Sequence, residues 1–292
     1  MNRVICAGLI AVDIVFELST FPTKGTKNRA TTSKMITGGG ALNAASAIAG
    51  LGANACLVGA IGDDALGEFL RNKMLERHID DQFVAIIPGV PTSRSANIIT
   101  ADGDRTIINH RDSLLIPHNF ELPSDLTFDA VLVDTRWPEG AKRIVEAARH
   151  AGKPSVIDAE APVALASDAL SLASHVVFSE QGLADFCGGS DAGALQRAAH
   201  KLSSWCAVTR GANPVLCHDG KQLTEVPTPT VKALNTLGAG DVWHAAFTLA
   251  LSQGRAEIDA VGWANTVATL KVSRAIQNDA MPTAAEVAAA YL

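Results

Sequence analysis

The 292-residue sequence has little of several features that mark whole classes of protein. Its five cysteines are scattered, with no C-x-x-C pair and no histidine at zinc-site spacing, which indicates reduced core thiols of a cytosolic protein. The formal net charge of -6 and the pI of about 5.7 argue against a nucleic-acid partner or an anionic membrane surface. The apolar run over 4–12 is too short to span a membrane, so we expect a cytoplasmic protein.

Two common nucleotide-binding motifs are also absent. No G-x-x-x-x-G-K-[ST] phosphate loop occurs, and Gly238-Ala239-Gly240 lacks the third glycine that a dinucleotide-binding fold requires. Two glycine clusters, at 38–40 and 238–240, nevertheless stand directly before segments with helical spacing of apolar residues. Each cluster predicts a turn that opens a helix and lets a small ligand approach the backbone closely.

The second cluster lies in 235–251, NTLGAGDVWHAAFTLAL, which follows an extended run over 225–233 and predicts a strand, a glycine turn and a helix. The free N–H groups of Gly238, Ala239 and Gly240 would favour an anion. Asp241 at the helix start has two interpretations. It caps the free N–H groups of the first turn, or it accepts a hydroxyl proton while those groups neutralise a phosphoryl group in transfer.

The first cluster, Gly38-Gly39-Gly40, precedes a predicted helix over 41–51, in which Asn43 presents its amide from the first turn. The alternative to a ligand site is a flexible hinge with tight helix packing. Asp13 follows the apolar run over 3–12, which is typical of a strand buried on both faces in a parallel sheet. Ligands bind at the carboxyl ends of such strands, although an aspartate there is also a common turn residue.

The rest of the chain indicates a core and a smaller appendage. Apolar strands alternate with helical segments from 129 onward, which predicts a three-layer α/β/α core with a mostly parallel sheet, formed by 1–13, 37–82 and 110–292. The segments 14–36 and 83–109 are extended, and Asp102-Gly103 is a turn signal within a hairpin. We expect these two segments to form a small β-sheet lid that closes over a substrate.

Both glycine clusters resemble signatures of one family. Thr236-x-Gly238-Ala239-Gly240-Asp241 is similar to the C-terminal signature D-T-x-G-A-G-D of the ribokinase-like (PfkB) carbohydrate kinases, with Asn235 in place of the first aspartate. The N-terminal part of the chain resembles the other signature of that family, which has Gly-Gly, then Asn, and later G-x-D-x-x-G. The matching residues are Gly39, Gly40, Asn43, Gly59, Gly62, Asp63 and Gly67. The two signatures stand in the right order, and the resemblance spans nearly the whole chain.

The resemblance implies an ATP-dependent sugar kinase with the ribokinase-like fold. Asp241 would be the base, and Gly238, Ala239 and Gly240 would hold the phosphoryl group in transfer. The residues that would contact the sugar are Asp13, Gly39, Gly40 and Asn43.

The nucleotide side departs from the family pattern. Ser179-Glu180-Gln181-Gly182 stands where the family usually has Asn-x-x-Glu, which helps to place Mg²⁺. We still expect ATP and Mg²⁺ as cofactors, because the charge that develops on ATP needs screening, but we assign no metal ligand. By resemblance, Thr209 and Gly211 form a turn beside the nucleotide phosphates, together with Thr236. Asn265 lies on a helix similar to the adenine wall, with a structural role inside the helix as its alternative.

Three further residues bear on the substrate. Lys27, in the first predicted lid strand, Asn109 and Arg136 stand in a pattern similar to the sulfofructose-kinase branch of the family, in which they would surround an anionic C6 substituent. The resemblance implies phosphoryl transfer to the C1 hydroxyl of 6-deoxy-6-sulfofructose, with fructose 6-phosphate or a neutral ketose or ribose as alternatives. Arg136 has a second interpretation, an ion pair with Asp134 or Glu139 on the surface.

Two other classes of function stay open. The altered residues Asn235, Ser179 and Gly182 favour a sugar- or nucleotide-binding regulator that has lost catalysis, whereas the intact Asp241 favours an enzyme. A kinase of nucleosides would need aromatic residues for stacking, and the sequence has one tyrosine and 5% aromatic residues. The exposed edges of a small lid sheet favour a homodimer through the lid.

Overall fold

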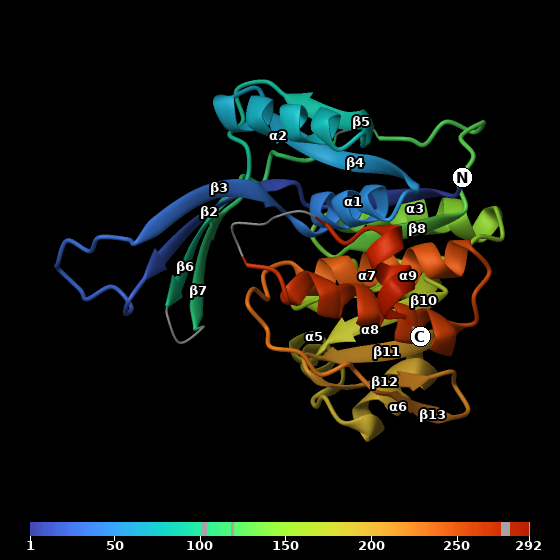
Figure 1. Ribbon diagram of the computed structural model, residues 1–292. Helices are drawn as coiled ribbons and strands as arrows, with labels where there is room; N and C mark the ends of the chain where they lie inside the picture. The colour runs from blue at the N-terminus through green and yellow to red at the C-terminus, as the bar shows by residue number, and fades with distance from the viewer. Residues whose placement is uncertain (101–103, 118–119, 276–280, 292) are drawn as a thin grey trace.

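The computed structural model describes residues 1–100, 104–117, 120–275 and 281–291 (Figure 1). Within these ranges the main sheet has nine strands. Their spatial order is β13 (Leu223–Val226), β12 (Asn213–His218), β11 (Trp205–Arg210), β10 (His175–Ser179), β9 (Ser155–Ala159), β8 (Ala130–Asp134), β1 (Arg3–Ala7), β4 (Asn54–Gly62) and β5 (Asp80–Ile87). Neighbours from β11 to β5 pair in parallel, and β12 and β13 pair antiparallel.

Helices cover both faces of this sheet, because successive side chains of a buried strand point to opposite sides. Val4 and Cys6 pack in one core cluster, and Ile5 and Ala7 pack in the other. The first cluster lies under α1 (Gly40–Gly50), α2 (Ala65–Glu76), α7 (Ala239–Ser252), α8 (Glu257–Val272) and α9 (Ala284–Ala290). The second lies under α3 (Pro138–His150), the 3₁₀ helix Val163–Ala166, α4 (Ser167–Leu172), α5 (Glu180–Cys187) and α6 (Ala192–Leu202). The predicted three-layer α/β/α core is confirmed.

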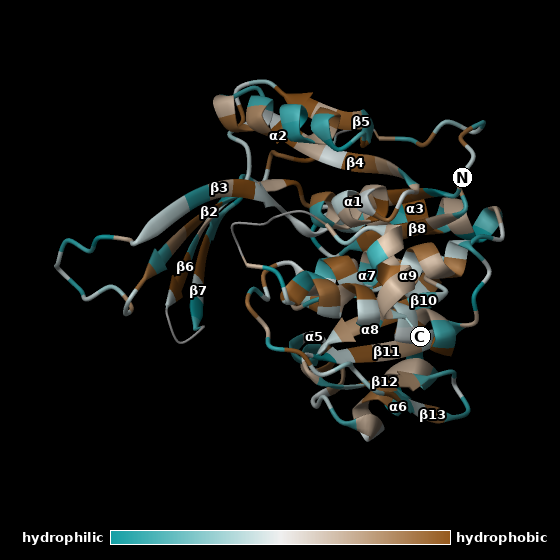
Figure 2. Cartoon of the chain, viewed as in Figure 1, coloured by the Kyte–Doolittle hydropathy of each residue, from teal (hydrophilic) through white to brown (hydrophobic). Residues whose placement is uncertain are grey.

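A separate four-stranded sheet projects from one end of the core as a lid (Figure 1). Its order is β3 (Thr32–Gly38), β2 (Ala11–Leu18), β6 (Arg94–Thr100) and β7 (Arg105–His110). The pair β6 and β7 is antiparallel, as the hairpin prediction requires, while the turn predicted at Asp102-Gly103 lies outside the described residues. Polar residues dominate the loop at the free end of the lid, whereas apolar residues dominate the inner strands of the core (Figure 2).

Three segments differ from the prediction. The run 3–12 forms two strands, because the chain turns at Gly8, where φ is 144° and an added Cβ would lie 2.2 Å from the Asp134 carboxyl carbon. Asp13 therefore lies inside lid strand β2 and not at the end of a core strand. The part 83–87 pairs with β4 at the edge of the main sheet, so it is not lid. The extended run expected over 225–233 is a strand only to Val226.

The cysteines and the helices can be compared with the expectations of reduced thiols and of no membrane span. All five cysteines are unpaired thiols, four of them buried and Cys187 half-buried. Burial raises the pKa of Cys206 to about 12, so this thiol stays protonated at neutral pH. Within the described ranges, none of the helices combines the length and the apolar character that a membrane crossing requires.

Candidate active site

Helix α7 fixes the position of Asp241. Every residue from Val242 to Leu251 is buried, and the Trp243 and Phe247 rings stack with centroids 5.2 Å apart. This burial anchors the helix, so its N-terminal turn has a defined place. Gly238 precedes the helix in the left-handed region, with φ of 71°. The first N–H groups of a helix have no partner within it, and they point out of its N-terminal end, where Gly240 and Asp241 stand.

The backbone of the predicted anion-binding turn is accessible at Gly240, whereas the Ala239 N–H already has a hydrogen-bond partner. Apart from its own helix and chain neighbours, no atom of the described residues lies within 4 Å of the place where a Cβ on Gly240 would be, so a ligand can approach that backbone closely. The Ala239 N–H donates to the Thr236 carbonyl over 3.3 Å. The Gly240 and Asp241 N–H groups are therefore better placed for an anion than the Ala239 N–H.

The two glycine clusters meet at Asp241. Asn43 Nδ2 donates to Asp241 Oδ2 over 2.7 Å, although the two residues are 198 positions apart. A Cβ on Gly40 would lie 3.4 Å from Asp241 Oδ1, so only a small residue leaves room at this point. Gly39, with φ of 86°, opens α1 here. The structure thus brings Gly39, Gly40 and Asn43 to the same end of the sheet as the start of α7.

Burial is the main cause that raises the pKa of Asp241 to about 7, and the charge of Asp158 contributes to this rise. The hydrogen bond from Asn43 and the charge of His244 act in the opposite direction. A carboxyl group with a pKa near the working pH is suited to accept a proton from an alcohol. The geometry therefore favours the base interpretation of Asp241 over a cap, and no cap hydrogen bond precedes this helix within the described contacts.

A small cavity behind Asp241 gathers groups that sequence reasoning missed. It measures about 10 Å³ and is lined by Asp134, Asp158, Asp241, His244 and small residues of α1 and β1. Burial raises the pKa of Asp134 to about 6, while the N–H groups of Leu9 and Arg136 donate to it. The two sheet carboxylates face each other in the register of β8 and β9. The signal in the sequence was an aspartate near the carboxyl end of each strand.

Asp13 is the centre of a polar network on the lid. Ser95 Oγ donates to Asp13 Oδ1 over 2.5 Å, and Asn97 Nδ2 donates to Ser95 Oγ over 2.7 Å. The register places Asp13, Ser95 and Asn109 in one row across β2, β6 and β7. Burial raises the pKa of Asp13, and the two hydrogen-bonding neighbours oppose the shift. Ser95 and Asn97 were not predicted.

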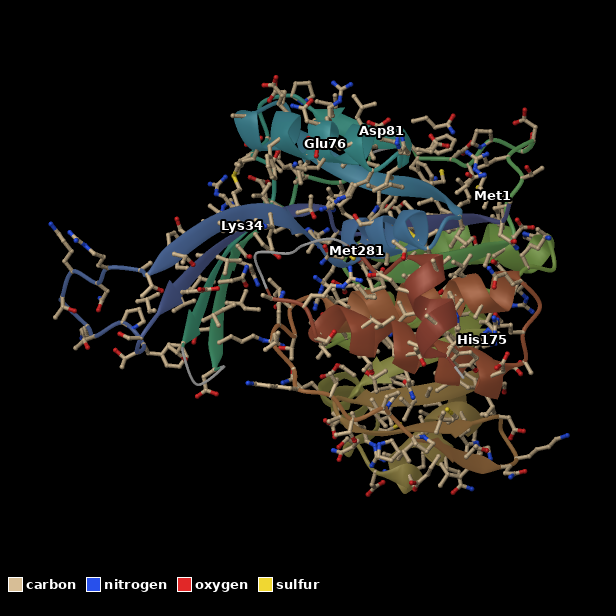
Figure 3. The ribbon with its side chains drawn as sticks, viewed as in Figure 1. Met1, Lys34, Glu76, Asp81, His175 and Met281 are labelled. Atoms are coloured by element: carbon tan, nitrogen blue, oxygen red, sulfur yellow. The ribbon has the colours of Figure 1, made fainter. Side chains whose placement is uncertain are left out.

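Asp13 and the turn before α7 line a second cavity. This cavity of about 30 Å³ is lined by Asp13, Asn43, Gly238 and Asn235, and also by Arg77, Lys271 and Met281. Met281, labelled in Figure 3, comes from the segment before α9. Asn235 Oδ1 accepts from the Leu237 N–H over 3.0 Å, so this residue shapes the turn before α7. The cavity joins the lid network to the start of α7.

The three residues expected around an anionic substituent have different surroundings. Lys27 was expected in the first lid strand, but it is exposed in the loop between β2 and β3 at the free end of the lid. Arg136 pairs with neither Asp134 nor Glu139 through its guanidinium. Its Nη2 donates to Glu160 Oε2 over 2.8 Å and its Nη1 to the Ala161 carbonyl over 3.0 Å. The structure thus places Arg136 at the carboxyl end of β8 and Lys27 at the free end of the lid.

Arg111 is a further cation that sequence reasoning missed. It follows β7, and it is close enough to Asp134 and Arg136 for their charges to act on it. Burial is the largest cause that lowers the pKa of Arg111, and the neighbouring guanidinium of Arg136 adds to this. Two half-buried cations therefore lie beside Asp134, at the carboxyl end of β8.

On the predicted nucleotide side, polar side chains bond to the protein itself. Ser179 Oγ accepts from the Gly182 N–H over 3.0 Å and caps α5. Thr209 Oγ1 donates to the Phe178 carbonyl over 3.4 Å, and Gly211 turns the chain between β11 and β12 with φ of 60°. Thr236 Oγ1 accepts from Arg105 of the lid over 2.7 Å.

Asn265 has the structural role that was its alternative. It is 2% exposed, its Oδ1 accepts from Trp243 Nε1 over 2.7 Å, and its Nδ2 donates to the Pro227 carbonyl over 2.9 Å. These two bonds connect α8 to α7 and to the segment after β13. The contacts therefore favour this structural role over the predicted adenine contact, because both ends of the amide have partners within the core.

Comparisons with known proteins decide the family. The profile of the pfkB family carbohydrate kinases matches residues 1–284. The chain belongs to this PfkB family. The ribokinase of Lactococcus lactis is 26% identical over 301 residues, which cover 99% of this chain and 97% of that protein. An ATP-dependent ribose-1-phosphate kinase of Halopiger xanaduensis is 26% identical and covers 99% and 98%.

A solved structure agrees with the family assignment. A candidate ribokinase from Agrobacterium tumefaciens superposes on this PfkB kinase with a TM-score of 0.92 and 31% identity, over 99% of this chain and 97% of the other. The protein is thus an ATP-dependent carbohydrate kinase, a phosphotransferase with an alcohol acceptor. The relatives named here support the family and not its sulfofructose-kinase branch.

The loop expected to help place Mg²⁺ in a PfkB kinase lacks the usual glutamate at Gly182. A Cβ on Gly182 would lie 1.9 Å from the Ala159 carbonyl oxygen, so this backbone has no room for a glutamate at that position. In the described part of the chain, no group of three or more His, Cys, Asp or Glu side chains is arranged to hold a metal ion. Gly182 therefore cannot be replaced by the usual family glutamate without a shift of this backbone.

Proposed function

We propose that this PfkB kinase uses Asp241 as the base that accepts the proton of the attacking sugar hydroxyl. The hydrogen bond from Asn43 to Asp241 carries the proposal, because it holds the carboxylate where the two helix starts meet. The hydroxyl proton passes to Asp241, the hydroxyl oxygen bonds to the γ-phosphorus of ATP, and the bond from that phosphorus to the bridging oxygen breaks. The N–H groups at the start of α7 neutralise the transferred group.

The sugar-binding residues of this proposal lie on both sides of Asp241. Asp13, held by Ser95 and Asn97, accepts hydrogen bonds from sugar hydroxyls, and Asn43 with the backbone of Gly39 and Gly40 closes the other side. Bound Mg²⁺ would screen the phosphate charge of ATP. Thr209, Gly211 and Thr236 remain our candidates beside the phosphates, and Ser179 acts there only through the start of α5.

An anionic ketose is the substrate that we propose first, with 6-deoxy-6-sulfofructose phosphorylated at its C1 hydroxyl. Arg111 and Arg136 support it, because two like charges held near each other gain from an anion between them. Asn109 lies in the same sheet row as Asp13 and adds an amide on the lid side. Fructose 6-phosphate presents a similar charge to the same donors.

A neutral sugar is the second candidate. The ion pair of Arg136 with Glu160 already supplies one anion to that guanidinium, which weakens the case for a charged substrate. The relatives reported above are named as ribokinase and ribose-1-phosphate kinase, so ribose belongs in any test.

The test compares ADP release with Mg-ATP and five acceptors: 6-deoxy-6-sulfofructose, fructose 6-phosphate, fructose, ribose and a nucleoside. Arg136→Ala should lower kcat/KM for the anionic ketose roughly tenfold to hundredfold and leave fructose unchanged, because a hydrogen-bonded charge is lost. Arg143→Ala is the matched control, since Arg143 forms a more exposed ion pair with Glu139 on α3. Equal effects of Arg136→Ala on charged and neutral sugars would contradict an anionic substrate.

A homodimer through the lid is the assembly that we propose. The lid exposes apolar side chains on strand β7 and on strand β3, with Ile108 60% exposed and Met35 42% exposed. Light scattering should show Ile108→Lys shifted towards the monomer, because a charge would be buried in the interface. Leu75→Lys on α2, at a position 75% exposed, is the control and should keep the dimer. A wild-type monomer would refute the proposal.

A further inference from the structure

His244 is a buried histidine one helical turn from the catalytic start of α7. It is 3% exposed, and its Nδ1 lies 2.7 Å from the Gly240 carbonyl oxygen. A carbonyl oxygen can only accept, so Nδ1 carries a hydrogen and donates it. This contact fixes the ring orientation and leaves Nε2 as the nitrogen that faces the sheet.

Nε2 of His244 faces a carboxylate and not a donor. It lies 3.5 Å from Asp158 Oδ1, and it has no hydrogen-bond partner among the described residues. With a hydrogen on Nδ1, a neutral ring would present a bare acceptor to an ionised carboxylate, which is also an acceptor. The pair is stable when one proton resides on either the nitrogen or the oxygen. The His244 and Asp158 pair then carries no net charge.

This pair shares a cavity with Asp241. Asp241 and His244 are three positions apart on α7 and so lie on one face of the helix, with Asp134 and Asp158 across the cavity on β8 and β9. Burial raises the pKa of Asp158, and the charge of His244 opposes the shift. Other charged groups act on the cluster from neighbouring segments: Glu160 after β9, Arg136 after β8 and Arg111 after β7.

We propose that His244 is a positioning residue of phosphoryl transfer: the proton that it shares with Asp158 cancels the charge that would otherwise keep Asp241 protonated. The inference rests on the proposed role of Asp241 as the base. Asp241 ionises near neutral pH more readily when Asp158 is compensated, because uncompensated carboxylates in one small cavity repel each other. The other carboxylate across the cavity, Asp134, already accepts hydrogen bonds from the N–H groups of Leu9 and Arg136. His244 supplies that compensation without contacting the sugar.

The test follows kcat/KM for the best sugar at saturating Mg-ATP, across a pH range that spans the Asp241 pKa of about 7. The rate falls on the acid side as Asp241 becomes protonated. His244→Asn should move this acid limb to higher pH, because the Asp158 charge is left uncompensated. Asp158→Asn should move it to lower pH, because the charge of Asp158 raises the Asp241 pKa more than the charge of His244 lowers it, and this remaining repulsion is removed. Each displacement should be on the order of one pH unit.

His175→Asn is the matched control. His175 is also buried, with Nε2 3.7 Å from Glu257 Oε1, but it stands at the opposite end of β10 from Ser179 (Figure 3). This variant should lower stability and leave the acid limb in place. ATP titrates in the same way in every reaction, so only the displacement between variants counts.

The two opposite displacements distinguish the proposal from a packing role. A packing role would lower the rate at every pH, and coincident profiles or shifts in the same direction would overturn the inference. If His244→Asn does not fold, the profile of Asp158→Asn decides alone by its direction. If Asp241→Asn keeps full activity, the proposed base itself fails; if it is inactive and the profiles coincide, only the role of His244 fails.

Discussion

Polar side chains on the proposed sugar side bond to one another beside the cavities, whereas those on the proposed nucleotide side bond to helix starts, strands and side chains away from the cavities. Asn43 bonds to Asp241 and Ser95 bonds to Asp13, in both cases next to a cavity. Ser179 caps α5, and Asn265 connects two helices in the core. The difference supports our proposal that side chains recognise the sugar, and that backbone N–H groups of helix starts and turns bind the nucleotide.

The physical reason lies in the two ligands. A sugar hydroxyl is neutral and directional, so recognising it takes individually placed carboxylate and amide groups. Phosphates are multiply charged, and backbone N–H groups at a helix start or turn bind them without any particular side chain. Family residues can therefore change on the nucleotide side, as at Gly182, while the fold keeps its binding turns.

The change with the largest expected effect is Asp241→Asn. It should lower kcat about 10²- to 10⁴-fold, because a general base is lost, while binding of the sugar persists. ADP release and calorimetric titration of the sugar measure the two quantities. Asp168→Asn, which breaks an exposed ion pair with Lys142, should leave both unchanged. Near-normal turnover by Asp241→Asn would show that Asp241 is not the base and that the catalytic group lies elsewhere.

Gly182→Glu, which restores the usual family residue, tests the nucleotide side next. It should lower the free energy of unfolding by about 3 kcal/mol, because the new Cβ would overlap the Ala159 carbonyl. Denaturant unfolding measures this, and Gln181→Glu on the exposed neighbour should change it by less than about 0.5 kcal/mol. A stable and more active variant would show that the loop can still serve a metal.

Asn265→Ala separates a core role from a nucleotide contact. It should lower the free energy of unfolding by about 2 kcal/mol, because Trp243 Nε1 and the Pro227 carbonyl lose their partner. The KM for ATP should stay unchanged. A raised KM with normal stability would place Asn265 back among the nucleotide ligands and break the contrast between the two sides.

The smallest effect is expected from Asn235→Asp, another return to the family pattern. Aspartate offers the same oxygen to the Leu237 N–H, so the turn before α7 should persist. We expect the free energy of unfolding to change by less than about 0.5 kcal/mol, with similar kinetics. A large gain in kcat would mean that Asn235 lowers the turnover of this enzyme. The departures from the family pattern that matter would then include the turn before α7, and not only the nucleotide side.

Local features of the sequence were sufficient to predict the starts of α1 and α7. Glycine before an apolar run with helical spacing sets both helix starts, so Asn43 and Asp241 were found as candidates before any contact was known. The alternation of strands and helices likewise predicted the three layers. A continuous apolar run is less informative, which is why 3–12 was taken for one strand where the chain forms two.

The amino-acid sequence by itself determined the fold class, the two glycine turns and the aspartate that follows one of them, because these depend on local spacing and composition. Only the tertiary structure decided which distant groups meet. Asp158 and His244 lie far apart in the chain, and they face each other because the register of parallel strands and the packing of α7 place them around one cavity. Contacts of this kind depend on the relative positions of whole elements, which no local pattern specifies.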